Sequence, residues 1–233
     1  MSSFSYQQRR GQLQTYFDRT AVDAWARLTS TAPVGRIRAT VRAGRDSMRE
    51  TLLSYLPMDL RGLRVLDAGC GTGAFSVAAA QRGAAVTAID LSPTLVELAR
   101  ERLPSQLGEG SIDFRVGDMF DAALGEFDYV VAMDSLIHYR VADVVRVLDG
   151  FAQRTHRSIV FTFAPKTPAL AAMHAVGRLF PRSDRAPAIE PIAESSLRQH
   201  LAQHTALHRW HPARTRLITS GFYKSQAMEL KRT

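Results

Sequence analysis

Five short runs of apolar, largely β-branched residues alternate with longer helical stretches between residues 62 and 163. Strands that are separated by helices pair side by side in a parallel sheet, with the helices packed on its faces. The alternation therefore predicts an α/β fold with short connections. The expected strands are residues 64–69, 85–90, 112–118, 127–134 and 158–164.

Capping residues mark the helices between these strands. Gly83 is placed to end a helix that begins at Ala74, and Ser92 followed by Pro93 supplies an N-cap and a first-turn proline for the next helix. Residues 141–151 place their valines and a leucine on one helical face. We therefore expect helices after the first, second and fourth strands.

Further elements are expected on both sides of this alternating region. Residues 5–56 are predicted to be helical, and their last part, 46–56, is amphipathic and ends at a proline. After the last strand, residues 168–181 form a helix bounded by prolines, and the proline-broken loop that follows is a candidate lid. The tail, roughly residues 207–230, alternates as two strands joined near residues 219–221, which predicts a terminal hairpin.

The composition fits one globular core with extensions. With 45% hydrophobic and 22% charged residues, the chain has the balance of a soluble protein, and 233 residues suffice to bury a large core. We expect a helical N-terminal arm or cap at residues 1–57 and a core at residues 58–233, with a lid insertion at about residues 166–195.

Cysteine content and hydropathy limit the compartment and the metal chemistry. Cys70 is the only cysteine, so this chain can form no intramolecular disulfide and no thiolate metal cluster, which suits a reducing compartment. The sequence has no run of eighteen apolar residues, and its N-terminus lacks the apolar stretch of a secretory signal. We therefore expect a cytoplasmic protein with no transmembrane segment.

Charge is segregated along the chain. The net charge of +8 is the balance of +5 in residues 1–50, −6 in residues 51–153 and +9 in residues 154–233. A uniformly basic surface would point to nucleic acid, whereas this pattern favours an acidic core whose flanks can offer arginines to an anionic ligand. Solvated arginine on helix faces explains the same charges without a ligand.

A glycine-rich loop follows the first predicted strand, in residues 67–73 with the sequence DAGCGTG. Glycines at such a turn let a ligand approach the amides at the start of the next helix. Ser76 stands where the last glycine of the dinucleotide fingerprint would fall, which counts against NAD. Asp67 precedes the first glycine by two residues, so it suits a ligand with a cationic end and would repel a diphosphate.

Ligand-competent residues also end the next three strands, the last of which closes with Met133 and Asp134. Asp90 can accept two hydrogen bonds from ribose hydroxyls, Asp118 can accept one from an exocyclic adenine amine, and Met119 can pack on the adenine face. Open α/β sheets bind their ligands at the carboxyl edge, where these side chains meet. The alternative reading takes the acids as helix caps and the glycine loop as an ordinary turn.

This constellation resembles the class I S-adenosylmethionine-dependent methyltransferases across residues 62–164 and the tail hairpin. The cofactor of that class has both a sulfonium and an ammonium group. The resemblance implies a Rossmann-like, seven-stranded, mostly parallel sheet that an antiparallel C-terminal hairpin completes. The residues expected to bind the cofactor are Asp67, Gly69, Cys70, Gly71, Asp90, Leu91, Ser92, Asp118, Met119, Met133 and Asp134.

Segments outside the generic core resemble the magnesium-protoporphyrin IX methyltransferases of chlorophyll and bacteriochlorophyll synthesis. The matching segments are Tyr16-Phe17 with Trp25, Arg42 with Gly44, residues 67–73, Leu136 to Tyr139, Phe163 to Pro168, Val176-Gly177, Leu179 to Pro181 and Phe222-Tyr223. They span nearly the whole chain. Two positions depart from the family pattern, Arg45 where histidine is expected and Asp18 where asparagine is expected, and both bear on contacts of the arm.

The resemblance implies specific roles. Tyr16 in an arm that covers the site and His138 after the fourth strand would be the catalytic residues. We expect the two propionates of the porphyrin to bind basic flank residues, Arg42 and Lys166 first. The magnesium belongs to the substrate, magnesium-protoporphyrin IX, and the protein itself needs no metal. The resemblance also suggests pigment delivery from the large subunit of magnesium chelatase and loose association with photosynthetic membranes.

Alternatives remain at this point. The chain could methylate another small acid or RNA, although the tetrapeptide typical of nitrogen methylation on nucleic acids and an appended RNA-binding module are both missing. It could also be an NAD-dependent oxidoreductase, or a tetrapyrrole-binding module without activity. His200, His204 and His208 have the spacing of zinc ligands on one helix face, but no acid or thiolate joins them there. We expect a methyltransferase and no nucleic-acid partner.

Overall fold

The computed structural model describes residues 4–19, 29, 35–166 and 189–233. Expectations for the other residues, among them the helix at 168–181, most of the lid, and the family motifs at Trp25 and at residues 176–181, lie outside the described residues.

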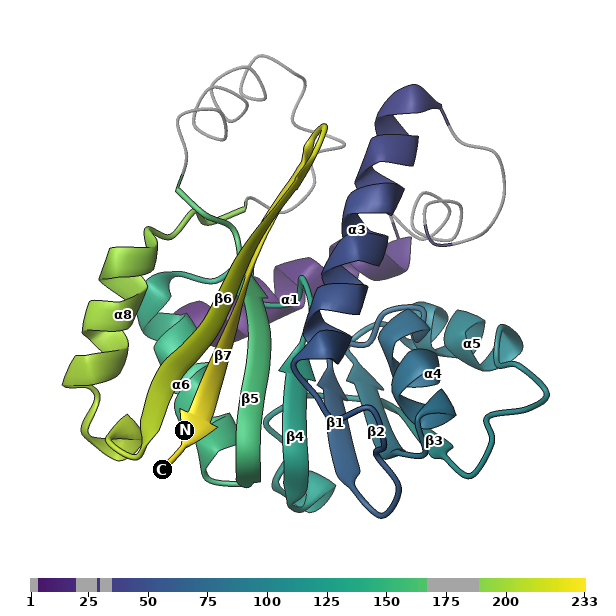
Figure 1. The fold of residues 1–233 in the computed structure, drawn as a ribbon. Helices are drawn as coiled ribbons and strands as arrows, with labels where there is room; N and C mark the ends of the chain where they lie inside the picture. The colour runs from purple at the N-terminus through teal and green to yellow at the C-terminus, as the bar shows by residue number, and fades with distance from the viewer. Residues whose placement is uncertain (1–3, 20–28, 30–34, 167–188) are drawn as a thin grey trace.

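A seven-stranded sheet forms the centre of the molecule, in the order β3-β2-β1-β4-β5-β7-β6 (Figure 1). Strands β1 to β5 run parallel, whereas β7 pairs antiparallel with β5 and with β6. The strands are β1 (Arg64–Ala68), β2 (Ala85–Asp90), β3 (Ser111–Val116), β4 (Phe127–Ala132), β5 (Thr155–Phe163), β6 (Trp210–Ser220) and β7 (Tyr223–Arg232). The predicted α/β sheet with a C-terminal hairpin is confirmed.

Helices cover both faces of the sheet and one of its edges. They are α1 (Phe4–Arg19), α3 (Arg36–Ser54), α4 (Ala74–Gln81), α5 (Pro93–Glu101), α6 (Val141–Ala152) and α8 (Glu194–Gln203), with short 3-10 turns η1 (Ala122–Leu124) and η3 (Thr205–Leu207). The predicted N-cap is confirmed, because Ser92 accepts a hydrogen bond from the backbone N–H of Leu95 and Pro93 is the first residue of α5. None of the described helices is long and apolar enough to cross a membrane.

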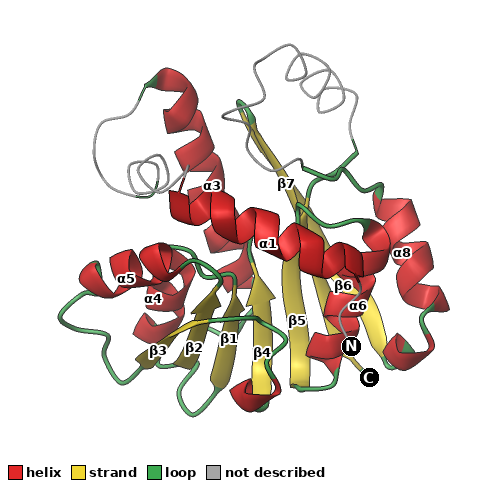
Figure 2. Cartoon of the chain, turned by 180° about the vertical axis from the view of Figure 1, so that it is seen from behind, coloured by secondary structure: helices red, strands yellow, loops and turns green. Residues whose placement is uncertain are grey.

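Two hydrophobic layers hold these elements together. Met48 of α3 and Phe75 of α4 pack on one face of the sheet with Val96 of α5. On the other face, Phe151 of α6 and Leu197 of α8 are fully buried. Each such side chain contributes roughly 1.5–3 kcal/mol to folding through its removal from water. Helix α1 lies across the carboxyl edge of the strands, as seen from behind in Figure 2.

Several strand boundaries differ from the sequence-based expectation, most of them by one or two residues. Strand β3 ends before Gly117, and β4 ends before Asp134, whose φ of 54° is incompatible with extended backbone. Strand β5 begins three residues earlier than expected, at Thr155. Each predicted strand is therefore present, with its ends shifted by local backbone geometry.

Helix α8 is absent from the expectations. Its N-cap residue, Ala193, offers no side-chain hydrogen bond, and only Leu197 and Leu201 of the helix are buried, so its sequence pattern is weak. The helix ends at Gln203, which leaves His208 beyond the following 3-10 turn. The three histidines with zinc-like spacing thus do not share one helix, and no group of three possible metal ligands occurs among the described residues.

Candidate active site

A cavity of about 540 Å³ opens at the carboxyl edge of the sheet. Its walls are the loops that follow β1 to β4, together with α1 and α3. Of the residues expected from the sequence, those that line it are Asp67, Gly69, Cys70, Gly71, Asp90, Leu91, Ser92, Met119, Met133, Asp134, His138 and Arg42. The sequence therefore predicts most of one connected site.

Backbone geometry explains the glycines of the loop after β1. Gly69, Gly71 and Gly73 have φ values of 84°, 53° and 76°, in the left-handed region that side chains disfavour. A Cβ added to Gly69 would also collide with the side chain of Ser135, on the loop after β4. The loop is therefore shaped by close approach between two strand ends, and it exposes backbone to the cavity.

Asp67 is a buried acid at the bottom of this cavity. It is 1% exposed, and Ser76 donates a hydrogen bond of 2.5 Å to its Oδ2. Burial, together with the nearby Asp90, raises the pKa of Asp67 to about 7, although the hydrogen bond from Ser76 opposes the shift. A cation beside Asp67 would relieve the cost of ionising this carboxyl, so the site suits a positively charged ligand.

Asp90 shapes the loops on both sides of it. Its Oδ2 accepts a hydrogen bond from the backbone N–H of Gly71 at 2.9 Å, and its Oδ1 accepts one from that of Ser92 at 3.0 Å. The Asp90 carboxylate therefore connects the glycine loop to the start of α5, and carboxylate oxygens are also suitable acceptors for the hydroxyl groups of a ligand.

Helix α1 meets the end of β3 through Tyr6 and Asp118. The Tyr6 hydroxyl donates to Asp118 at 3.0 Å, and Arg10 forms an ion pair with the same carboxylate at 3.2 Å. The Tyr6 ring stacks on Tyr139 with 5.2 Å between centroids and meets Phe120 edge-on at 4.9 Å. Burial raises the pKa of Tyr6, which keeps its hydroxyl protonated as a donor. Asp118 thus lies behind Tyr6, which lines the cavity, and is not itself among the lining residues.

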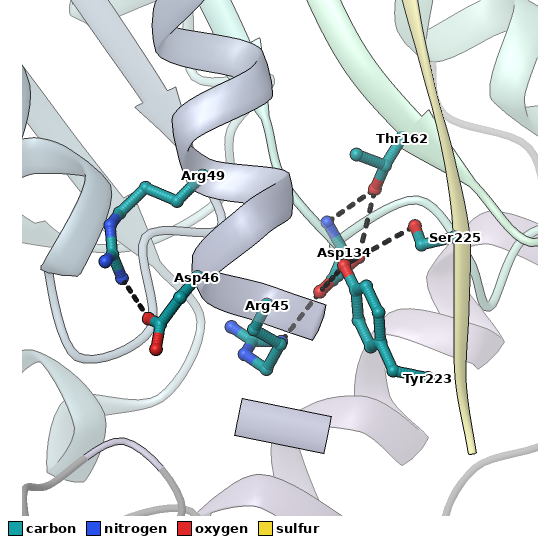
Figure 3. A network of polar contacts seen from close by, with 7 residues as sticks. All are labelled: Arg45, Asp46, Arg49, Asp134, Thr162, Tyr223 and Ser225. Carbon is teal, nitrogen blue, oxygen red and sulfur yellow. Dashed lines mark hydrogen bonds and ion pairs between the residues drawn. The ribbon is translucent and has the colours of Figure 1, made fainter. Parts of the chain in front are cut away.

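One face of α3 turns charged side chains toward the cavity. Arg45 forms an ion pair with Asp134 at 2.8 Å, and Arg49 forms one with Asp46 at 2.8 Å (Figure 3). Arg42 lies one turn earlier and also lines the cavity. These arginines bring positive charge to a site whose floor is acidic.

The two expected catalytic residues occupy different places. His138 is 7% exposed and lines the cavity from the loop after β4. Tyr16 is half-buried near the end of α1 and is not among the lining residues, although burial raises its pKa. Lys166 is exposed, its backbone N–H donates to the Ile192 carbonyl at 3.0 Å, and it does not line the cavity either.

Several residues of the site are missing from the expectations. Tyr6, Arg49 and Tyr139 all line the cavity. The spacing of Arg42, Arg45 and Arg49 was a usable signal, because residues three and four apart share one helix face. Tyr6 had no such signal, since its position depends on where α1 crosses the sheet.

Comparison with known proteins identifies the family of this site. A model described as magnesium-protoporphyrin IX methyltransferase C-terminus matches residues 132–232, and a general methyltransferase domain matches residues 65–157. Magnesium-protoporphyrin O-methyltransferase of Rhodobacter capsulatus is 50% identical over 97% of this chain and 98% of its own length. The chain belongs to the magnesium-protoporphyrin O-methyltransferase family. The member from Synechocystis is 30% identical over 95% of both chains.

A solved structure of this family shares the fold. The crystal structure of magnesium protoporphyrin IX methyltransferase from Synechocystis with bound S-adenosylhomocysteine matches with a TM-score of 0.81 at 29% identity, covering 96% of this chain and all of that one. A second structure, with bound S-adenosylmethionine, matches with a TM-score of 0.77 at 26% identity, covering 97% of each chain. The sequence resemblance to magnesium-protoporphyrin methyltransferases is confirmed over nearly the whole chain.

Proposed function

We propose that this chain transfers a methyl group from S-adenosylmethionine to one propionate carboxylate of magnesium-protoporphyrin IX, giving the monomethyl ester in (bacterio)chlorophyll biosynthesis. The observation that carries the proposal is the 50% identity, over nearly both full lengths, to a magnesium-protoporphyrin O-methyltransferase. The cavity supports it, because acidic and glycine-rich strand ends and the arginines of α3 line the same cavity.

The residues of the cavity fit the proposed cofactor. Asp67 would hold its cationic amino-acid end, and Asp90 would accept hydrogen bonds from its ribose. Met119 would pack on the adenine. Asp118 does not line the cavity, so it could accept a hydrogen bond from the adenine amine only where the Tyr6 hydroxyl moves aside. The raised pKa of Asp67 supports this arrangement, since a buried acid is stabilised in its charged form by a neighbouring cation.

The proposed reaction mainly requires the acceptor carboxylate to be aligned with the methyl group of the cofactor. The cofactor supplies a methyl group on a positively charged sulfur. The acceptor is a carboxylic acid with a pKa of about 4 in water, so it is already ionised at neutral pH and needs no strong general base. We propose that His138 orients the acceptor carboxylate by hydrogen bonds and that Arg42 binds propionate charge. Tyr16 and Lys166 do not line the cavity, so they would take the same two roles where the bound porphyrin extends beyond it. Residues 1–57 would act as an arm that excludes water from the site.

One assay tests the proposed reaction. The protein is incubated with magnesium-protoporphyrin IX and methyl-labelled cofactor, and the pigment is separated by chromatography. We expect label in a monomethyl ester. A protein that binds the cofactor and the porphyrin but forms no ester would instead be a binding module, and label in RNA or in another acid would establish a different acceptor.

Contact with membranes is a further proposal. Ile37 of α3 and Phe222 of the hairpin turn are 59% and 52% exposed, and a hydrogen bond of 2.8 Å from Ser220 to the Thr40 carbonyl places these two segments side by side. Exposed apolar side chains next to the basic residue Arg38 suit an anionic lipid surface. Co-sedimentation of the protein with anionic vesicles tests this contact.

We also propose that the large subunit of magnesium chelatase delivers the pigment to this protein. Co-purification of the two proteins tests this delivery.

The acid at the bottom of the cavity predicts a pH dependence. The pKa of Asp67 is about 7 in the folded protein without ligand, and a cation favours the ionised form. Binding below pH 7 must therefore expel a proton, and affinity falls as the pH decreases. The affinity for S-adenosylhomocysteine, which retains the ammonium group, is expected to be about tenfold weaker at pH 6 than at pH 8.

Titration calorimetry of Asp67→Asn measures this effect. The variant should bind more weakly at pH 8, and its affinity should be nearly independent of pH. The free energy of unfolding of the ligand-free protein changes with pH in the opposite direction to the affinity. Because the pKa of Asp67 is raised in the folded protein, its ionisation lowers the stability of that protein as the pH rises from about 4 through 7. A steep pH dependence that persisted in Asp67→Asn would assign it to another group.

A further inference from the structure

The carboxylate of Asp134 joins three segments that are far apart in the sequence. It lies just after β4 and accepts hydrogen bonds from Arg45 of α3 at 2.8 Å and from Thr162 of β5 at 3.2 Å. From β7 it accepts hydrogen bonds of Tyr223 at 3.0 and 3.1 Å and of Ser225 at 3.1 Å (Figure 3). Helix α3 of the N-terminal arm and strand β7 of the C-terminal hairpin thus meet at the Asp134 carboxylate.

The acceptor capacity of this carboxylate is used within the protein. An ionised carboxylate offers about four lone-pair sites. Oδ1 of Asp134 accepts from Tyr223, Ser225 and Thr162, and Oδ2 accepts from Arg45 and Tyr223. The Asp134 side chain is 7% exposed. A direct polar contact with a ligand would have to displace one of these donors, so Asp134 differs from Asp67 and Asp90.

Helix α3 is fitted closely to the hairpin beside Asp134. A Cβ added to Gly44 would lie 2.5 Å from the ring of Tyr223, so only glycine allows the helix to rest on that ring. The Ser220 hydroxyl also donates to the Thr40 carbonyl at 2.8 Å. The position of α3 in turn fixes Arg42 and Arg49, which line the cavity.

Asp134 also sets the path of the loop that carries His138. It is the one non-glycine residue with positive φ among the described residues, at 54°, and its backbone N–H donates to the Thr162 hydroxyl at 2.7 Å. Such a conformation costs free energy and persists where the surroundings impose it. The next residue, Ser135, packs against Gly69 of the glycine loop.

We propose that Asp134 is a positioning residue, which holds α3 and the His138 loop around the cavity through Arg45 and Tyr223 and does not itself bind the cofactor. This proposal rests on the proposed methyl transfer and replaces the expectation of a cofactor contact. It predicts that loss of the network misplaces the acceptor while the cofactor still binds.

Asp134→Asn and Tyr223→Phe test the proposal. Asparagine tolerates positive φ as aspartate does, so the first variant removes the charge and replaces one acceptor oxygen by an NH2 donor without a new backbone conflict. We expect kcat/KM for the porphyrin to fall about tenfold in each, with S-adenosylhomocysteine affinity within about threefold of the wild type. The double variant should be little worse than either single one, because both remove the same network.

Asp128→Asn is the matched control. Asp128 lies at the opposite end of β4, is 20% exposed and pairs with Arg157 at 3.0 Å, so the same substitution removes a comparable ion pair far from the cavity. It should leave kcat/KM within about twofold of the wild type. A tenfold loss of cofactor affinity in Asp134→Asn but not in Tyr223→Phe would make Asp134 a ligand and overturn the proposal, as would full activity in both.

Hydrogen exchange separates this proposal from the proposed function. The amides of α3 should exchange faster in Asp134→Asn and Tyr223→Phe than in the wild type or in Asp128→Asn, whether or not any ester forms. Unchanged exchange of the α3 amides in these variants would contradict the positioning role of Asp134, even if the wild-type enzyme is active. If Asp134→Asn does not fold, Tyr223→Phe carries both measurements alone, since it removes one hydroxyl and keeps the ring that Gly44 contacts.

Discussion

Replacement of His138 by alanine is expected to lower kcat for methyl transfer about 100-fold. His138 is buried, lines the cavity and follows Asp134 in the loop after β4, which is the side where we place the acceptor carboxylate. The acceptor needs no strong base, and the loss would therefore come from poor alignment of a nucleophile that is already ionised. Cofactor affinity should stay within about threefold, because the proposed cofactor contacts lie on the first three strand ends.

Single-turnover kinetics and calorimetry on the same preparation measure the two quantities. His156→Ala is the matched control: His156 is 52% exposed and pairs with Glu126 at 3.2 Å, at the opposite edge of the sheet. Tyr16→Phe should also lower turnover more than affinity if the arm tyrosine reaches the acceptor. Full rates in both His138→Ala and Tyr16→Phe would remove the proposed catalytic roles.

The elements of the sheet could be predicted because their signals are local. The Ser92-Pro93 cap and the β-branched strands depend on neighbouring residues only. Helix α8 has no side-chain cap and few buried residues, so its formation depends on packing against α6 and could not be foreseen. The predicted end of β4 was wrong because a single residue, Asp134, changes the direction of the backbone there.

Residues of the site divide in the same way. Asp67, Asp90 and the glycines were predictable, since the ends of parallel strands meet at one edge. The partners of Asp134 were not, because Arg45 and Tyr223 lie 89 residues from it on either side. Arg45 departs from the family pattern, and this very residue ties the arm helix to the core. The family pattern identifies Arg45 as an unusual position, but only the folded structure shows that its partner is Asp134.

Asp90→Ala is expected to weaken cofactor binding by roughly 1–3 kcal/mol, about 5- to 150-fold in Kd. The variant removes the proposed acceptor of the ribose hydroxyls. It also removes the acceptor of the Gly71 and Ser92 backbone N–H groups, so part of the loss would come from a looser glycine loop. At saturating cofactor, kcat should change little, because Asp90 lies away from the proposed acceptor.

Calorimetry with two ligands separates the contributions of Asp90. S-adenosylhomocysteine and its 2′-deoxy analogue should differ clearly in affinity for the wild type and only slightly for Asp90→Ala, because the variant has no carboxylate for the hydroxyl to reach. Asp113→Ala on β3 is the control, since Asp113 is 58% exposed and pairs with Arg115 on the surface. If the deoxy analogue lost the same affinity in both proteins, the ribose would bind elsewhere. Weaker cofactor binding by Asp90→Ala would then come from the changed shape of the glycine loop alone.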